Sequence, residues 1–436
     1  MKRYILGERA SLNFLFPLIF LFFYSVKFTG LPNFSHLGGV LIPFVFFLIS
    51  KVGYSLKVIT SSLKFWLLLA VFFMFLTLSV AVPFLHGTAD FSLLPTIAHS
   101  IFIIPACMAI SSLINNGRDD DPLGNIVNLL GWLLKLQVVF ILLMLVSSDA
   151  RDFVHGFVRT ESQLDRMAVY QGSRGLGVSG SVAFGLSTQL AINYLLYFFM
   201  LYVSRCSSYK VIDYVWMGLG VIAMFSAGRT SVISVVFLPF AIFMYSVQFK
   251  KVSIKGFAFD SVVVAFVLSL FVFFYYIFGL SENESIQRYI FYVFQPVDHF
   301  LRTGSFEVSS LKGLNNMYYY PGDKTFIFGD GRYSSDSGGY YGSVDAGYMR
   351  YILYGGVFYQ ILCSVGFLYF CIIFNSVLKR YLLGSHWLVI SIFFVTFVLH
   401  YKGDFMLLAV NPNKIYFVVI FYFICLRARE NRSLST

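Results

Sequence analysis

The stretch FWLLLAVFFMFLTLSVAVPFL, residues 65–85, decides the fold class of this 436-residue chain. It has no charged residue, and about 20 apolar residues in a helix cross the roughly 30 Å hydrocarbon core of a bilayer. Similar runs recur along the chain, which is 58% hydrophobic and only 12% charged. Soluble domains carry about twice that charged share, disorder requires low hydrophobicity, and membrane barrels show short alternating segments. We therefore predict an all-α polytopic membrane protein.

Apolar runs broken at polar, Gly or Pro clusters predict about twelve transmembrane helices in a single integral membrane domain, residues 1–436. Two connections on the outer side, residues 148–177 and 280–347, are too long to be simple turns. We expect them to be structured loops packed on the membrane that carry the functional residues. The predicted spans are 11–26, 37–53, 65–85, 92–114, 126–147, 178–203, 211–228, 230–248, 259–279, 348–375, 386–401 and 412–426.

Short cytoplasmic loops carry an excess of Lys and Arg, which sets the orientation of the chain. With the N-terminus inside, the inner loops and ends hold 17 such residues and the short outer connections 4. We therefore predict that both termini are cytoplasmic and that the triplet Asp119–Asp121 forms a solvated inner turn. The inner residues are Lys2, Arg3, Arg9, Lys51, Lys57, Lys64, Arg118, Arg205, Lys210, Lys250, Lys251, Lys255, Lys379, Arg380, Arg427, Arg429 and Arg432; the outer ones are Lys27, Arg229, Lys402 and Lys414.

The net charge of +11 does not indicate nucleic-acid binding, because the basic residues are spread over many short loops. The five Cys residues fall in apolar runs or short linkers, so no disulfide framework is expected. Run 11–26 follows basic residues without a small-residue cleavage site, which favours a retained anchor over a removed signal peptide.

The first candidate site is the hairpin Ser226-Ala227-Gly228-Arg229-Thr230 between two apolar runs. A charge at that depth is costly unless it is satisfied. A helix starting at Val211 brings Arg229 near the outer interface, where a planar guanidinium suits bidentate recognition of phosphate. The alternative is an Arg that reaches lipid phosphates from a helix end.

The second candidate site is the segment Asp345-Ala346-Gly347-Tyr348-Met349-Arg350, followed by Gly355-Gly356. A carboxylate and a cation five residues apart at the outer end of a helix indicate the rim of a site. A helix beginning at Asp345 would favour a bound phosphate through its dipole. As an N-cap, Asp345 would instead be purely structural.

Further basic residues lie on the outer side, among them Arg174, Arg302 and Arg332, and they indicate an anionic partner. His400 and Lys402 end the eleventh span there, as a base or phosphate contact or as ordinary interfacial residues. Lys135 lies mid-membrane without an assigned role. Zinc-protease, Walker-type and nucleophile-elbow motifs are not found, so we expect no metal or cofactor and a substrate that is already energised.

From about residue 210 to 415 the chain resembles the O-antigen polymerases of the Wzy type. The resemblance lies in Phe328-Gly329-Asp330-Gly331-Arg332, in the Asp345–Arg350 segment running into Leu353-Tyr354-Gly355-Gly356, and in the Arg229 hairpin. Some family members carry an Arg followed eleven places later by Gly in both large periplasmic loops. Arg174 with Gly185, and Arg302 with Gly313, have this spacing.

The resemblance implies a GT-C-like glycosyltransferase of the bacterial inner membrane, which moves a growing glycan from one undecaprenyl diphosphate carrier to another carrier-linked repeat unit. It also implies a polysaccharide chain-length regulator as partner. We expect Arg229, Arg332 and Arg350 to hold the diphosphate, Asp345 to take the proton, and Arg174 to contact carrier or glycan. We expect the following aromatic residues to stack on sugars: Tyr333, Tyr340, Tyr341 and Tyr348.

A lipid-linked oligosaccharide flippase and an O-antigen ligase stay open as alternatives. A flippase is expected to carry its charges in a central cavity and to have short loops. Ligases usually place a His where this chain has Asp345, which favours the polymerase.

Overall fold

The computed structural model describes residues 15–28, 30–49, 53–115, 123–168, 174–181, 184–205, 208–249, 284–305, 309–336 and 338–433. These residues form helices and no β-strand, apart from an isolated bridge between Ser334 and Tyr340. The predicted all-helical class is confirmed. The predicted span 259–279 and the triplet Asp119–Asp121 lie outside the described residues.

Within the described ranges, seven helical segments are long and apolar enough to cross a membrane, as expected of a membrane protein. Each coincides in position with a predicted span, as do two shorter apolar helices, α2 (Phe34–Ile49) and α11 (Val211–Ala227), and the long helix α19 (Val410–Ser433). Residues 15–23 are also helical. The seven are α4 (Leu63–His86), α5 with α6 (Leu94–Phe102 and Ile104–Asn115), α7 (Gly124–Val146), α10 (Phe184–Ser204), η1 with α12 (Arg229–Val232 and Ile233–Gln248), α17 (Gly347–Leu378) and α18 (Ser385–Lys402).

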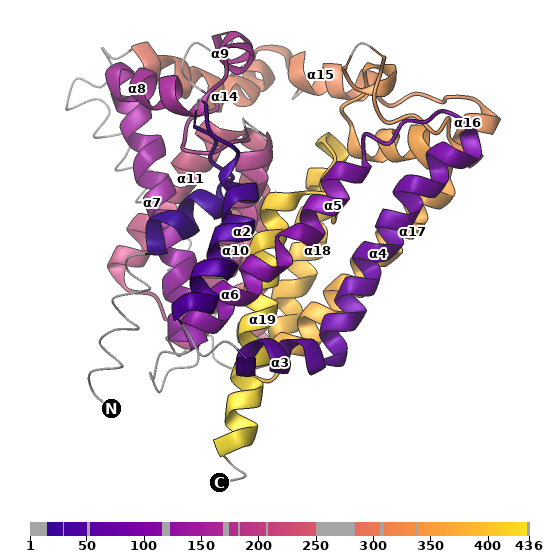
Figure 1. The fold of residues 1–436 in the computed structure, drawn as a ribbon. Coiled ribbons are helices and arrows are strands. Elements are labelled where there is room, and N and C mark those ends of the chain that lie inside the picture. Colours follow the sequence, from indigo (N-terminus) through magenta and orange to yellow (C-terminus); the bar gives the residue numbers. More distant parts are fainter. Residues whose placement is uncertain are drawn as a thin grey trace.

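Shorter helices cover the ends of this bundle. The outer-loop segments predicted at 148–177 and 280–347 contain α8 (Ser148–Val158), α9 (Glu161–Ala168), α14 (Glu284–Thr303), α15 (Ser309–Asn316), α16 (Asp323–Phe328) and η3 (Tyr341–Ser343). Figure 1 shows α8, α9, α14, α15 and α16 together at one end, opposite α3 (Gly53–Ser61) and the last turns of α19. The two long loops therefore form one structured cap on the bundle.

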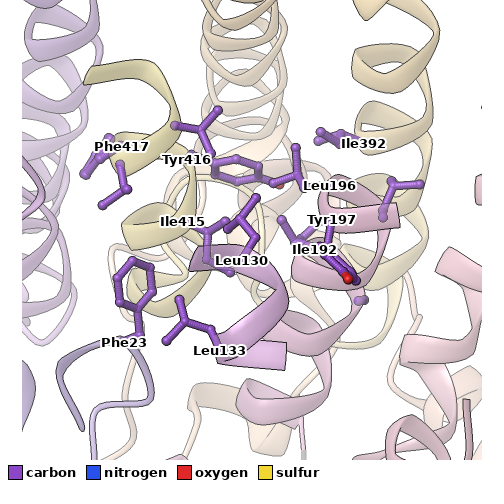
Figure 2. Close-up of a cluster of buried hydrophobic side chains, with 14 of the residues drawn as sticks. Phe23, Leu130, Leu133, Ile192, Leu196, Tyr197, Ile392, Ile415, Tyr416 and Phe417 are labelled. Atoms are coloured by element: carbon purple, nitrogen blue, oxygen red, sulfur yellow. The ribbon is translucent and has the colours of Figure 1, made fainter. Parts of the chain in front are cut away.

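The core lies where α7, α10, α18, α19 and the 15–23 helix meet. Figure 2 shows Phe23, Leu130, Ile192, Ile392 and Tyr416 pointing into this common interior. α10 is the central helix. Of its 18 most apolar consecutive residues 94% are buried inside the protein, whereas the corresponding share for α4 is 39%. The remaining apolar surface of helices such as α4 suits contact with lipid.

α17 is broken near the end that meets the cap, which we call its outer end. Gly355 and Gly356 leave the helical conformation, and Gly356 has φ +73°. The carbonyls of Leu353 and Tyr354, released by the break, accept hydrogen bonds from the backbone N–H groups of Asp330 (2.7 Å) and Gly331 (2.9 Å). The break separates a short outer piece, residues 347–354, from a lower piece of about 22 residues that is sufficient to cross a bilayer. These two hydrogen bonds therefore fix the outer piece and the loop 329–331 to each other.

The first helix and the last are joined by a buried lysine. The Lys414 ammonium donates to the carbonyl of Phe22 (2.6 Å), the hydroxyl of Ser25 (2.5 Å) and the amide oxygen of Asn411 (3.2 Å). Its side chain is fully buried. Phe22 lies in the last turn of the 15–23 helix, whose free carbonyls favour a cation. The sequence predicted Lys414 in an outer connection. In the structure Lys414 is instead buried and joins the 15–23 helix to α19.

Candidate functional site

Three cationic side chains from distant parts of the chain gather at the capped end of the bundle. The guanidinium carbon of Arg229 lies 4.2 Å from the ring centroid of Tyr292 in α14, and that of Arg174 lies 5.9 Å from the same centroid. Lys402, the last residue of α18, interacts electrostatically with both arginines and with Asp345. We call Arg174, Arg229 and Lys402 the cation cluster.

Local backbone contacts place the two arginines side by side. α11 ends at Ala227, and the Ser231 hydroxyl lies 3.0 Å from the Met224 carbonyl, which turns the chain into η1 with Arg229 at its start. The backbone N–H of Gly175, next to Arg174, donates to the carbonyl of Ser226 at 2.9 Å. The outer end of α11 therefore orders both residues.

Arg229 carries unused hydrogen-bonding capacity. Its Nη1 is buried and has no hydrogen-bond partner among the described residues. Within the same described ranges, no carboxylate lies within ion-pair distance of Arg229 or Lys402. A buried cationic donor is costly without an acceptor, so the cluster is suited to an external anion.

A close approach of two helices brings Asp345 toward this cluster. At Gly347, a Cβ atom would lie 2.4 Å from the His400 carbonyl oxygen and 2.6 Å from that of Gly403, so only Gly allows the contact between α17 and the end of α18. The helix starts at Gly347 with Ala346 as N-cap, so Asp345 is neither its first residue nor its N-cap, the two alternatives considered from the sequence. The Asp345 carboxylate is left exposed and uncommitted to the helix end.

The environment of Asp345 is electrostatically mixed. Although the residue is exposed, the protein packed around its carboxyl removes part of the surrounding water and raises the pKa of that carboxyl above the ordinary value, while Arg350 and Lys402 work against this rise and Asp404 adds to it. A carboxylate with a raised pKa is a better proton acceptor than an ordinary aspartate. Asp345 is thus the group near the cation cluster that is best suited to general-base chemistry.

Arg350 is held in an aromatic clamp. Its guanidinium carbon lies 3.8 Å from the ring centroid of Tyr333 and 4.0 Å from that of Tyr340, on the outer piece of α17. The Tyr333 hydroxyl donates to Asp404, which also accepts a hydrogen bond from Tyr351 at 2.7 Å. Arg350 is therefore engaged in fixing the loop that carries Tyr333 and Tyr340.

Tyr348 and His400 belong to the contact between α17 and α18. The Tyr348 hydroxyl donates to the Phe397 carbonyl at 3.0 Å, and its ring meets that of His400 edge-on at 4.6 Å. His400 is fully buried, and its Nδ1 accepts a hydrogen bond from the Phe405 N–H at 3.1 Å. Both residues therefore belong to the packing between α17 and α18 that supports the site.

The Gly329–Arg332 motif anchors the loop. Asp330 accepts hydrogen bonds from the hydroxyls of Thr325 (2.7 Å) and Tyr341 (3.1 Å), so both its carboxylate oxygens are used. Arg332 pairs with exposed Asp336 at 3.3 Å. The structure thus brings together Arg174, Arg229, Lys402 and Asp345, whereas Arg332 points to its own ion pair.

The two predicted Arg–Gly pairs differ in surroundings. Arg174 belongs to the cluster, and a Cβ on its partner Gly185 would lie 2.6 Å from the Ser181 side chain, so that glycine packs tightly. Arg302 pairs with Asp298 on α14 at 2.9 Å, and Gly313 lies in open space. Arg174 of the first pair therefore lies at the site. Arg302 of the second pair is engaged within α14, and Gly313 lies in α15 with no close neighbour.

Sequence reasoning missed Tyr292 and Asp404. Tyr292 sits under both arginines, and Asp404 accepts two tyrosine hydroxyls. Asp404 follows His400 and Lys402 by only a few residues, a spacing that could have drawn attention to it. Tyr292 lies in an amphipathic stretch rich in aromatic residues, with no local feature that distinguishes it.

The arrangement can bind an anion with two guanidinium groups and one ammonium beside a carboxylate that is able to take a proton. No protein-family model matches the chain, and neither do the curated proteins or the solved structures with which it was compared. The chemistry of the site is therefore inferred from the cation cluster and Asp345 alone.

Proposed function

We propose that this chain polymerises undecaprenyl-diphosphate-linked oligosaccharide repeat units into O-antigen or a related surface polysaccharide, at the periplasmic face of the bacterial inner membrane. The observation that carries the proposal is the cation cluster of Arg174, Arg229 and Lys402 beside Asp345. A lipid-linked diphosphate places its charge at headgroup level, which is where an outer-end cluster would meet it.

In the proposed reaction, a hydroxyl oxygen of the acceptor sugar attacks the anomeric carbon of the donor glycan. The bond between that carbon and the phosphate oxygen breaks, and the electron pair leaves with the undecaprenyl diphosphate. Asp345 takes the hydroxyl proton. The cation cluster stabilises the charge that develops on the leaving diphosphate, which is the interaction that lowers the barrier.

Two further features support this proposal. The structured cap lies opposite the end of α19 (Figure 1), as expected for a cytoplasmic C-terminus and a periplasmic cap. Basic residues are concentrated in the short loops assigned to the cytoplasmic side. In this scheme the cap is also the surface available to a chain-length regulator, the partner that the family resemblance implies.

The flippase alternative has less support. A flippase is expected to hold its charges in a central cavity, whereas the Lys135 ammonium lies 5.6 Å from the Tyr197 ring and 5.5 Å from the Trp216 ring, inside the helical packing. The ligase alternative would use a histidine near the Asp345 segment. His400 reaches that place from α18 but is fully buried, so Asp345 is the more accessible base.

The test is the chain length of surface glycan in cells that depend on this gene. Cells without a polymerase carry single capped repeats, whereas cells without a flippase or ligase carry none. We expect Arg229→Gln and Asp345→Asn each to give mainly single repeats. The matched control Arg302→Gln removes a cation from the same cap that is paired with Asp298, and it should preserve full polymer. Long polymer in the Arg229→Gln, Asp345→Asn double variant would refute the proposal.

A further inference from the structure

The segment that carries Arg174 is irregular backbone buried inside the helical body. Residues 174–181 form no helix, yet Gly175 to Ser179 are all buried. Such backbone is tolerated at this depth only if its polar groups find partners within the protein. The Ser179 hydroxyl and the Gly180 N–H both donate to the Tyr24 carbonyl at 3.1 Å, and Gly175 donates to Ser226.

Three carbonyls of this segment accept hydrogen bonds from one side chain, that of Arg159. Its Nη1 donates to the Ser179 carbonyl, and its Nη2 donates to the carbonyls of Gly177 (3.1 Å) and Gly175 (3.3 Å). Arg159 is only 4% exposed. A planar guanidinium has five N–H donors in a fixed fork, so it can span three carbonyls that a lysine ammonium cannot reach together.

The Arg159 side chain bonds to backbone carbonyls and forms no ion pair within the described ranges. It follows the end of α8, where its own backbone N–H donates to the His155 carbonyl at 2.9 Å. No carboxylate in the described ranges lies within ion-pair distance of it. Burial lowers the pKa of Arg159 to about 10, which still leaves the side chain charged at neutral pH.

We infer that Arg159 is a positioning residue for anion binding: by holding the carbonyls of Gly175, Gly177 and Ser179, it fixes the backbone from which Arg174 reaches the ring of Tyr292 beside Arg229. The inference rests on the proposed function, because the anion is taken to be the diphosphate of a polyprenyl carrier. Arg159 touches no substrate in this scheme and acts only through Arg174.

A double-mutant cycle separates this role from a general contribution to folding. Binding of undecaprenyl diphosphate to the full-length protein in lipid nanodiscs would be measured for wild type, Arg159→Gln, Arg174→Gln and the double variant. Loss of one charged contact predicts roughly tenfold weaker binding for each single variant. Because Arg159 acts through Arg174, the double variant should bind no more weakly than Arg174→Gln. Equal losses from Arg159→Gln in both backgrounds would overturn the inference.

Amide hydrogen exchange gives a readout that does not need the ligand. Arg159→Gln should speed exchange at the N–H groups of Gly175 and Gly180, while Arg174→Gln should leave them protected. If the wild-type protein binds no undecaprenyl diphosphate, the proposed function fails; if exchange in Arg159→Gln is unchanged, the positioning role fails.

Two variants serve as controls. Arg159→Lys keeps the charge but not the fork, so it should lose most of the binding that Arg159→Gln loses, and it tests the same point if Arg159→Gln does not fold. Arg151→Gln removes another arginine of α8, which pairs with Asp152 at 3.4 Å, and should bind as wild type. An equal loss in Arg151→Gln would overturn the inference.

Discussion

Replacing Gly356 with alanine should detach the loop 329–331 from α17. Gly356 has φ +73° and ψ −176°, a conformation that costs other residues about 1–3 kcal/mol. An added Cβ would lie 2.0 Å from the Ile327 carbonyl oxygen and 2.4 Å from its carbonyl carbon, and neither atom belongs to a flexible side chain. Relief of this clash requires the loop to move away, with loss of its two hydrogen bonds to Leu353 and Tyr354, each worth about 1 kcal/mol.

The two hydrogen bonds oppose release of the loop, so the variant favours the detached loop only through the conformational cost of about 1–3 kcal/mol and the clash with Ile327. Every 1.4 kcal/mol is a factor of about ten, so the conformational cost alone should raise the open population by about five- to a hundredfold, and the clash should raise it further. Trypsin cleavage at exposed Lys324 in the detergent-purified protein should accelerate in proportion, because cleavage follows the open population when reclosing is fast.

Gly304 provides the matched control for this prediction. It also has φ +73°, but no atom lies within 4 Å of an added Cβ. Gly304→Ala therefore carries only the conformational cost, about 1–2 kcal/mol. If Gly356→Ala leaves cleavage at Lys324 as slow as Gly304→Ala does, the argument that the α17 break holds the loop is refuted.

Three further predictions concern charged groups. Arg350→Lys should speed amide exchange at Tyr333 about tenfold, since an ammonium cannot stack between two rings as a guanidinium does; unchanged exchange would contradict the clamp. As the proposed base, Asp345 must be ionised, so polymerisation should fall as pH drops through its raised pKa. Lys402→Met removes a cation that opposes this rise, so the acid limb of the pH–rate profile should move to higher pH, and a limb that stays in place would argue against Asp345 as the base. Lys414→Met should cost about 2–5 kcal/mol because it removes a fully buried ammonium that donates to four acceptors; a melting curve in detergent identical to that of wild type would count against this.

The helices were predictable because the length of an apolar run is a local property. Errors occurred where tertiary contacts decide the backbone. The predicted span 178–203 begins six residues before α10, since Arg159 and neighbouring helices hold residues 174–181 in a non-helical form. Gly175 and Gly177, both with positive φ, belong to the same irregular segment just before the predicted start.

The site was predictable in composition but only partly in arrangement. Arg229, Arg174 and Lys402 are far apart in sequence, and their meeting depends on how α11, α14 and α18 pack. Arg350 illustrates the reverse: its spacing from Asp345 indicated a shared site, but two aromatic rings occupy its guanidinium. No spacing rule reveals such a clamp, because Tyr333 and Tyr340 reach it from a loop.

The contact between Lys414 and Phe22 also governs the order of assembly. The two residues are separated by 392 positions, so the end of the first helix has its cationic partner only after nearly the whole chain has been translated. Until then the carbonyls of Phe22 and Phe23 lack this donor. A chain truncated before α19 would therefore lack the ammonium that caps this helix end.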